Sequence, residues 1–311
     1  MSANIDNTLD LEAFINQTND LVSQQEVYLT NSVIINVEEL VSGVSDLISL
    51  PEIYLQIRTL MDDMNSSLDD FASVVNTDPG LVALVLKIVN SAFYGFAGQI
   101  DNINRALNLI GIGQLHDLVL SLSAVDSLAL PNDIESLTVF WQRSIYCGVL
   151  SKLIAEKHYL QDTESLFVIG LLHEIGHLIL FMKYPKESKL AVHQAKSKNI
   201  PLTKAERALF GTEYGQIGQA LMAEWNLPSK FQCITRYHLE PCTATEYMLE
   251  TNIVHFAHMA AVNKFPGADS FQYPMDQDIM AQIKTSGEDM NALYDEAHEL
   301  SLAMEKLILG Y

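Results

Sequence analysis

The chain has 311 residues, 49% of them hydrophobic, with 39 Asp and Glu against 18 Lys and Arg. This length and composition suit a globular protein that buries one large core or two modest lobes. A net charge of −21 repels phosphate backbones and anionic lipid headgroups, so we expect neither direct nucleic-acid binding nor a membrane partner.

The N-terminus, the hydropathy and the cysteines indicate the compartment. Residues 1–20 contain four acidic residues and no Lys or Arg, so the cationic start of a secretory signal is missing. No apolar run is expected to be long enough to cross a bilayer. Cys147, Cys233 and Cys242 are widely spaced and form no C-x-x-C pair, which argues against a disulfide framework or a thiolate zinc site. The sequence therefore predicts a cytoplasmic protein.

The sequence predicts an amphipathic helical extension over residues 1–39. Five apolar residues follow helical spacing there: Leu11, Phe14, Ile15, Leu21 and Val22. Residues 40–131 predict a first helical lobe. In that lobe Asp78 and Pro79 combine a capping side chain with a proline at the first helical position, so a helix should begin there and end near Asn90. A further apolar series runs to Gly111, a residue suited to left-handed backbone after a helix terminus, and resumes beyond it.

Pro131 opens a break in the helical pattern, so we place a lobe boundary there and a second lobe over residues 132–265. Within this lobe residues 203–206 (TKAE) and 243–246 (TATE) fit the capping box, in which Thr and Glu side chains satisfy backbone donors. Each should open a helix. Residues 266–311 predict a loop followed by a C-terminal helix.

A locally basic region runs from Lys183 to Arg207. Its seven cations outnumber the two acids, Glu187 and Glu206. Solvated helix faces are the ordinary interpretation of such a run. The alternative is a docking patch for an acidic partner or a nucleotide phosphate, and we expect the region to contribute to a partner contact.

The most specific motifs lie in the first lobe. Residues 78–81 read Asp-Pro-Gly-Leu, residues 88–95 read Ile-Val-Asn-Ser-Ala-Phe-Tyr-Gly, and residues 106–111 read Ala-Leu-Asn-Leu-Ile-Gly. In this order and spacing they resemble the HDOD family, a non-catalytic-looking branch of the HD metal-dependent phosphohydrolase superfamily. The resemblance covers residues 50–261. It implies an all-α, two-lobe helical fold with an HD-like second lobe and a regulatory role in bacterial signalling.

The stretch around Phe93 has two interpretations. Asn90 can end one helix while Gly95 permits the reversal, which is the interpretation we favour. The rings of Phe93, Tyr94 and Phe96 then either plug the groove between the lobes or face a partner. The sequence does not choose between them.

The resemblance also places a substituted metal site in the second lobe. Residues 140–144 resemble the segment that carries the first histidine ligand of the superfamily, here Arg143, and residues 171–177 resemble the central histidine-aspartate helix, with Glu174 in place of aspartate. Further histidine positions are occupied by Tyr214 and Leu239. The candidates for the remnant site are Arg143, His173, Glu174, His177, Tyr214, His238 and His258.

We expect no cofactor and no dinuclear metal centre at these residues. Arg143 is a fixed cation without a lone pair, Leu239 has no ligand atom, and Tyr214 needs a deprotonated phenol to coordinate well. One adventitious zinc or iron ion could still be gathered by His173, Glu174, His238 and His258. Alternatively, Arg143 occupies the vacated position and pairs with the glutamate, so that a salt bridge substitutes for the metal.

Residues 173–177 also spell H-E-x-x-H, which on a helix sets two imidazoles on one face beside a carboxylate, as in a zinc protease. The longer form of this motif fails, since Lys183 stands where its last histidine would fall. Buried, hydrogen-bonded histidines on an apolar helix are the ordinary interpretation of such a pair.

Three functions are therefore open. The first is a non-enzymatic signalling protein that binds a regulatory protein or a small ligand such as a nucleotide. The second is a metal-dependent phosphohydrolase, and the third is a zinc protease. Metal content, turnover of phosphate esters and the effect of Glu174→Gln distinguish them.

Overall fold

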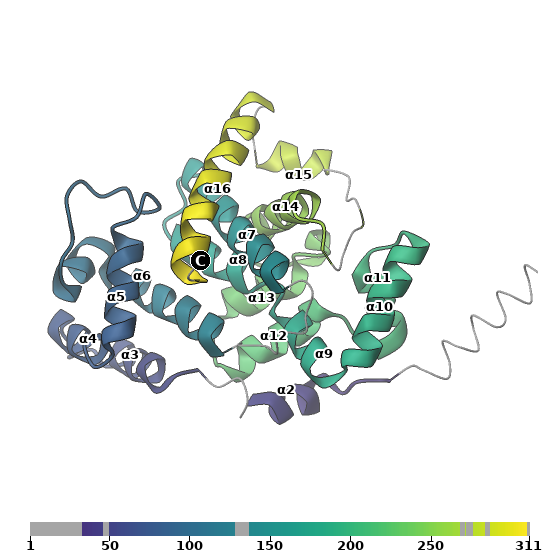
Figure 1. The fold of residues 1–311 in the computed structure, drawn as a ribbon, viewed down its shortest axis with the longest axis horizontal. Coiled ribbons are helices and arrows are strands. Elements are labelled where there is room, and N and C mark those ends of the chain that lie inside the picture. Colours follow the sequence, from purple (N-terminus) through teal and green to yellow (C-terminus); the bar gives the residue numbers. More distant parts are fainter. Residues whose placement is uncertain are drawn as a thin grey trace, which may run out of the picture.

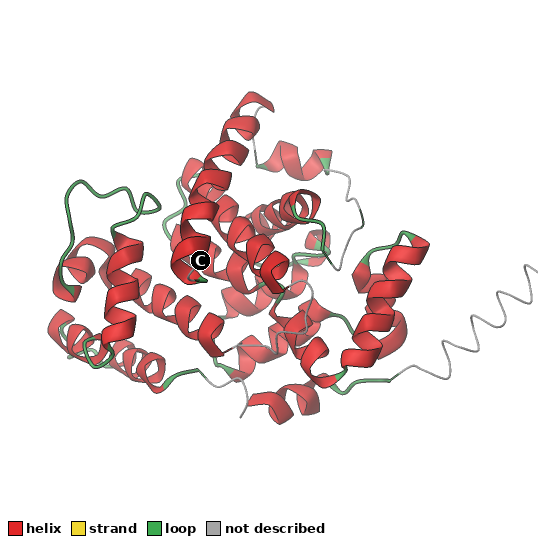
Figure 2. Cartoon of the chain, viewed as in Figure 1, coloured by secondary structure: helices red, strands yellow, loops and turns green. Residues whose placement is uncertain are grey.

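The computed structural model describes residues 33–45, 50–127, 137–267, 271, 276–283 and 287–309. These residues form helices and connecting loops, with no β-strand among them (Figure 2). The all-α expectation is confirmed. Of the extension predicted over residues 1–39, residues 1–32 lie outside the described residues, and so does the break at Pro131.

Four helices form the first lobe, at the left of Figure 1: α3 (Glu52–Asp62), α4 (Leu68–Val75), α5 (Pro79–Val89) and α6 (Ile103–Ser127). Helix α6 packs against the other three. It bends at Gly111, whose φ of 81° is readily adopted only without a Cβ, so the predicted interruption is confirmed.

Helix α5 begins and ends where the sequence predicts. The Oδ1 atom of Asp78 accepts hydrogen bonds from the backbone N–H groups of Gly80 and Leu81, at 2.8 and 3.0 Å. Asn90 caps the other end and also closes the loop that follows, because its amide makes two 2.7 Å hydrogen bonds with the backbone of Ile100. The loop that carries the aromatic motif is thus held at its base.

The second lobe contains eight α-helices and one short 3-10 helix: α7 (Leu137–Lys157), α8 (Thr163–Leu172), α9 (Ile175–Lys183), α10 (Pro185–Lys198), α11 (Leu202–Phe210), α12 (Tyr214–Glu224), α13 (Ser229–Tyr237), η1 (Pro241–Thr243) and α14 (Met248–Lys264). Helix α7 lies at the centre and contacts α8 and α14. The C-terminal helices are α15 (Gln277–Gln282) and α16 (Gly287–Ile308), and α16 packs back onto α7 and α5.

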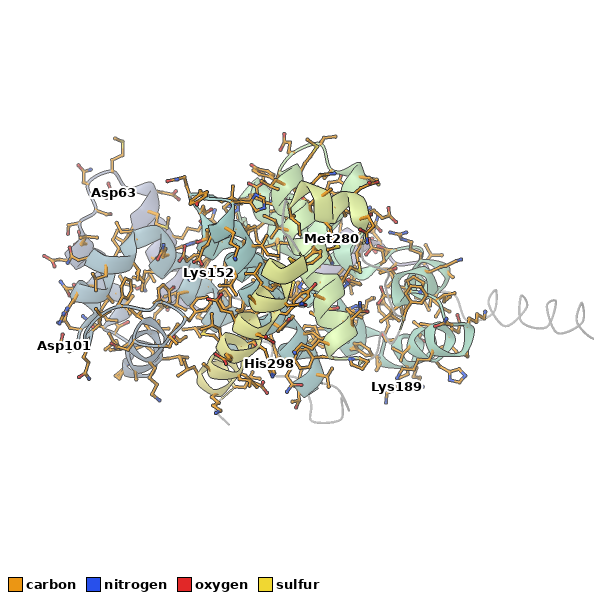
Figure 3. All side chains as sticks on the ribbon, turned by 90° about the horizontal axis from the view of Figure 1, so that it is seen from above. Asp63, Asp101, Lys152, Lys189, Met280 and His298 are labelled. Carbon is orange, nitrogen blue, oxygen red and sulfur yellow. The ribbon has the colours of Figure 1, made fainter. Side chains whose placement is uncertain are left out.

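The aromatic motif joins the two lobes. Phe93 is buried and lies 4.8 Å from the ring of Phe167 on α8, measured between centroids. The ammonium of Lys152, labelled at this junction in Figure 3, sits 3.9 Å from the Phe93 centroid and donates to its carbonyl oxygen at 3.3 Å. Phe93 therefore plugs the junction, whereas Phe96 is 37% exposed.

Helix α2 (Val37–Ser45) packs against α12 of the second lobe. Residues 40–45 had been assigned by sequence to the first lobe, but their contacts lie elsewhere. Residues 33–36 explain this placement, because they run beside the end of α11. There the backbone N–H groups of Val33 and Ile35 donate to the carbonyls of Leu209 and Phe210, at 2.8 and 3.0 Å.

Both predicted capping boxes are wrong. Helix α11 begins one residue before Thr203, with Pro201 at its N-cap, so the threonine lies in the first turn. Thr243 ends a 3-10 turn, and α14 begins only at Met248. In each case a proline two residues upstream starts the turn earlier, because its fixed φ suits the beginning of a helix.

Two described stretches are long and apolar enough, by length and composition, to cross a membrane: Ile103–Val125 and Thr163–Lys183. The helices α4 and α5, bent by 116°, would add a third if they formed one span. The expectation that no apolar run reaches this length is therefore wrong. Other helices of the protein cover these stretches, whose apolar windows are 56% and 89% buried, so they are apolar on more than one face.

Candidate functional site

The remnant-site residues come from six places in the second lobe: α7, the turn between α8 and α9, α9 itself, the start of α12, the end of α13, and α14. None of the seven residues is more than 3% exposed. A cluster of ionisable groups this deeply buried must be satisfied by its own members, because water is not there to solvate charge.

An ion pair lies on one side of this centre. The Nη2 atom of Arg143 donates to both carboxylate oxygens of Glu174, at 2.7 and 2.8 Å. Burial opposes ionisation of the carboxyl, but the positive charge of Arg143 outweighs it and lowers the pKa of Glu174. The expected pairing of these residues, 31 positions apart, is confirmed.

Three histidines form the other side. The Nδ1 atom of His173 lies 2.6 Å from the Gly170 carbonyl and that of His238 lies 2.7 Å from the Thr235 carbonyl. A carbonyl only accepts, so both Nδ1 atoms carry the proton and both Nε2 atoms accept. The His173 Nε2 then accepts from Nδ1 of His258 at 2.8 Å.

Burial keeps all three rings neutral. It lowers the pKa of His173 to about 4, and it holds the pKa values of His238 and His258 well below 6.5 with help from the neighbouring imidazoles. Tyr214 completes the group, since its hydroxyl lies 3.1 Å from Nε2 of His238 and donates to it. The result is two hydrogen-bonded pairs of neutral groups, His258 with His173 and Tyr214 with His238, packed against one another.

The side chain of His177 points away from the other three histidines. Its Nδ1 lies 2.9 Å from Oε1 of Glu206, and its ring stacks on Tyr214 with centroids 3.8 Å apart. Burial disfavours the imidazolium, but the Glu206 carboxylate outweighs burial and raises the pKa of His177.

The H-E-x-x-H motif therefore does not lie on one helix, and that expectation is wrong. Helix α8 ends at Leu172 and α9 begins at Ile175, so the backbone breaks within the motif. The first imidazole faces the histidine group, and the second faces Glu206. The shared helix face that a zinc protease site of this type needs is absent from this motif.

Sequence reasoning missed Glu206 as a member of the site and assigned it to a capping box. The residue is buried, binds His177, and accepts from the backbone N–H of Tyr214 at 3.2 Å. One signal was available: helical spacing sets Glu206 on the same face as the apolar residues Leu202 and Leu209. A carboxylate on an apolar helix face needs a buried partner.

The three buried histidines could hold at most one metal ion. One ligand nitrogen each from His173, His238 and His258 lie within 4.8 Å of one another, which is compact enough for a single ion. Two of those rings, however, are hydrogen-bonded to each other, and the Glu174 carboxylate that would bridge two ions is held by Arg143. The residues do not fit a dinuclear centre.

Comparisons with known proteins agree with this architecture. Residues 47–241 match the family model of the HDOD domain. A curated relative from Treponema pallidum, described as an uncharacterized protein, is 28% identical over 211 residues; the match covers 66% of this chain and 40% of that protein's length. This chain therefore accounts for less than half of that relative.

Solved structures share the fold. An HDOD domain protein of unknown function from Geobacter sulfurreducens has a TM-score of 0.68 at 22% identity, covering 87% of this chain and 97% of its own. A Marinobacter aquaeolei protein named for signal transduction has a TM-score of 0.67 at 23% identity, covering 83% and 59%. A Shewanella amazonensis protein named for phosphohydrolase activity has a TM-score of 0.66 at 21% identity, covering 86% and 97%.

Proposed function

Because this chain belongs to the HDOD domain family, we propose that it is a non-enzymatic regulatory module that acts by binding a regulatory protein or a small ligand such as a nucleotide. The cytoplasm is the compartment that goes with this role. The name of the structural neighbour from Marinobacter aquaeolei, which refers to signal transduction, supports the same class of function.

One observation carries the proposal: both oxygens of Glu174 are occupied by Arg143 inside a closed core. A hydrolytic two-metal centre clamps the attacking and leaving oxygens between ions that a carboxylate bridges. Here a guanidinium supplies the positive charge instead. It has no lone pair and no exchangeable coordination position, so it cannot activate water as a metal does.

The histidine group supports a structural role in place of catalysis. Each of its described hydrogen bonds joins the rings to one another, to Tyr214 or to a backbone carbonyl, and these bonds tie the end of α8 to α14 and α12 to the end of α13. A phosphoester would have to break several of these bonds to reach the rings. We infer that the centre stabilises a binding scaffold.

The decisive test combines metal analysis with a phosphodiesterase assay. Purified protein, His173→Ala and the matched control His193→Ala, whose histidine is exposed on α10, are assayed with bis(p-nitrophenyl) phosphate and added manganese, zinc or iron. We expect no paired metals and no turnover in any of them. A single partly occupied zinc or iron ion without turnover agrees with the proposal.

The alternative is a metal-dependent phosphohydrolase. Near-stoichiometric paired metals, with turnover abolished by His173→Ala and retained by His193→Ala, would overturn the proposal in its favour. Affinity capture from native cytoplasm, with identification of bound proteins and small molecules, then tests the binding role itself.

A further inference from the structure

A row of basic side chains follows one exposed face of α10. Lys186, Lys189, His193 and Lys196 are all exposed and stand at positions i, i+3, i+7 and i+10. At about 100° per residue they fall within roughly 80° of one another, and the row is about 15 Å long. Helices α10 and α11 lie at the edge of the molecule opposite the first lobe, and Lys189 is at the far end from Asp101 (Figures 1 and 3).

The charges of this row are not neutralised locally. Lys186, Lys189 and Lys196 form no ion pair with any described residue, whereas Lys152 and Lys230 do. The two acidic residues of the region, Glu187 and Glu206, form no ion pair with these lysines among the described residues. Glu206 is buried against His177, and Glu187 is only partly exposed. In a chain of net charge −21, this face is a separate positive region.

The described part of the chain begins near this face, at Val33. Val33 and Ile35 are hydrogen-bonded to the last residues of α11, Leu209 and Phe210. The ring of Phe210 lies 6.0 Å from that of Tyr184, the residue just before α10. Val33, where the described residues begin, therefore lies on the side of the molecule where α10 and its basic row begin.

Residues 1–32 have the complementary charge. They contain no Lys, Arg or His and five acids: Asp6, Asp10, Glu12, Asp20 and Glu26. Glu26 is seven residues from Val33, which spans about 10 Å at helical rise and about 23 Å when extended. Asp20 reaches about 20 to 43 Å in the same way. Either conformation lets both carboxylates reach a row of that length.

We propose that residues 1–32 dock on the basic face of α10 of their own chain. The tether gives the segment a high effective concentration at that face, so a few exposed ion pairs suffice to hold it there. The docked segment covers the surface that an acidic partner would need, and such a partner must displace it. This inference goes beyond the proposed function and does not depend on it.

Lysine acetylation of the full chain tests the docking. The comparison is between the protein and a variant that carries Asp6→Asn, Asp10→Asn, Glu12→Gln, Asp20→Asn and Glu26→Gln, which removes the negative charges and leaves the described core unchanged. At low salt we expect Lys186, Lys189 and Lys196 to react about threefold faster in the variant, as for a face covered about two thirds of the time. Exposed lysines elsewhere, Lys87, Lys157 and Lys306, are internal controls and should not change.

Carbodiimide cross-linking identifies the occupant. Links from Asp20 or Glu26 to the three lysines of the row, lost at high salt because exposed ion pairs are screened, support the proposal. Mixing isotope-labelled and unlabelled chains separates links within a chain from links between two copies. Equal acetylation in protein and variant, or links only between copies, would overturn it.

Discussion

The ion pair of Arg143 with Glu174 differs from that of Arg207 with Glu240 chiefly in burial. The side chains of the first pair are 4% and 1% exposed, whereas those of Arg207 and Glu240 are 42% and 47% exposed. A buried charge is stabilised mainly by its ion-pair partner, because it has lost its hydration. An exposed charge stays hydrated when its partner is removed. The two pairs therefore have different consequences for stability.

Replacing the arginine of each pair measures this difference. Arg143→Met leaves Glu174 charged and buried, so we expect the free energy of unfolding to fall by roughly 3 to 5 kcal/mol. Arg207→Met should change it by less than about 1 kcal/mol. Urea denaturation checks both, and Arg143→Met combined with Glu174→Gln should recover part of the loss. Similar losses for the two arginine variants would contradict the account of the centre.

The neutral histidines predict acid sensitivity. The folded protein resists protonation of His173, whose pKa is about 4, while the unfolded chain accepts that proton near pH 6.5. The unfolded state then binds more protons, so the free energy of unfolding should decrease as pH falls from about 6.5 to 4, by roughly 3 kcal/mol for this residue alone. His238 and His258 act in the same direction.

His177 acts in the opposite direction, because its pKa is raised in the folded state. Its contribution is fully present below the unfolded pKa and is lost as pH rises through the folded pKa. Denaturation at pH 7.5, 6 and 5 measures the balance, and His173→Gln should show a shallower decline than the parent. A stability that stays flat over this range would mean that the buried rings are protonated.

At the scale of elements, the position of α8 depends on how closely it approaches α7. A Cβ atom built on Gly170 would lie 2.6 Å from the Cα of Gly148. Only a pair of glycines allows the two backbones to come this close. Because His173 directly follows the last residue of α8, this crossing also sets the depth of the histidine group.

An alanine at this crossing should therefore be costly. Gly170→Ala forces α7 and α8 apart, and we expect it to lower the free energy of unfolding by about 1 to 3 kcal/mol. Gly113→Ala on α6 is the matched control, since nothing lies within 4 Å of its added Cβ. It should be neutral or stabilising by up to about 1 kcal/mol. Thermal denaturation of both variants tests the claim, which fails if Gly170→Ala is as stable as the control.

At the scale of the whole molecule, the two lobes are joined by few elements. Helix α6 contacts α8, α16 contacts α5, and Phe93 fills the junction between Phe167 and Lys152. The aromatic motif of the first lobe thus contributes directly to the junction with the second lobe.

Removing this plug should loosen the junction. Phe93→Ala leaves a cavity that costs about 3 to 5 kcal/mol and should speed hydrogen exchange at backbone amides of α6 and α8. Phe96→Ala removes the same ring from a partly exposed position and should leave the exchange of those helices unchanged. Equal effects of the two variants would show that Phe93 does not hold the lobes together.

Local sequence features were enough to predict the helical class, the ends of α5 and the bend at Gly111, and to show that the side chains of Arg143 and Leu239 offer no lone pair to a metal. Helix periodicity, caps and glycine conformations are local, and a side chain without a lone pair cannot become a ligand in any fold. These conclusions need no knowledge of which segments meet.

Only the tertiary structure decided which distant residues share a site. It turned His177 toward Glu206, placed α2 on the second lobe, and covered the apolar stretches that by length alone could span a membrane. It also placed Val33 and Ile35 beside the end of α11. The physical reason is that these outcomes depend on packing between segments far apart in the chain, to which local periodicity and composition are blind.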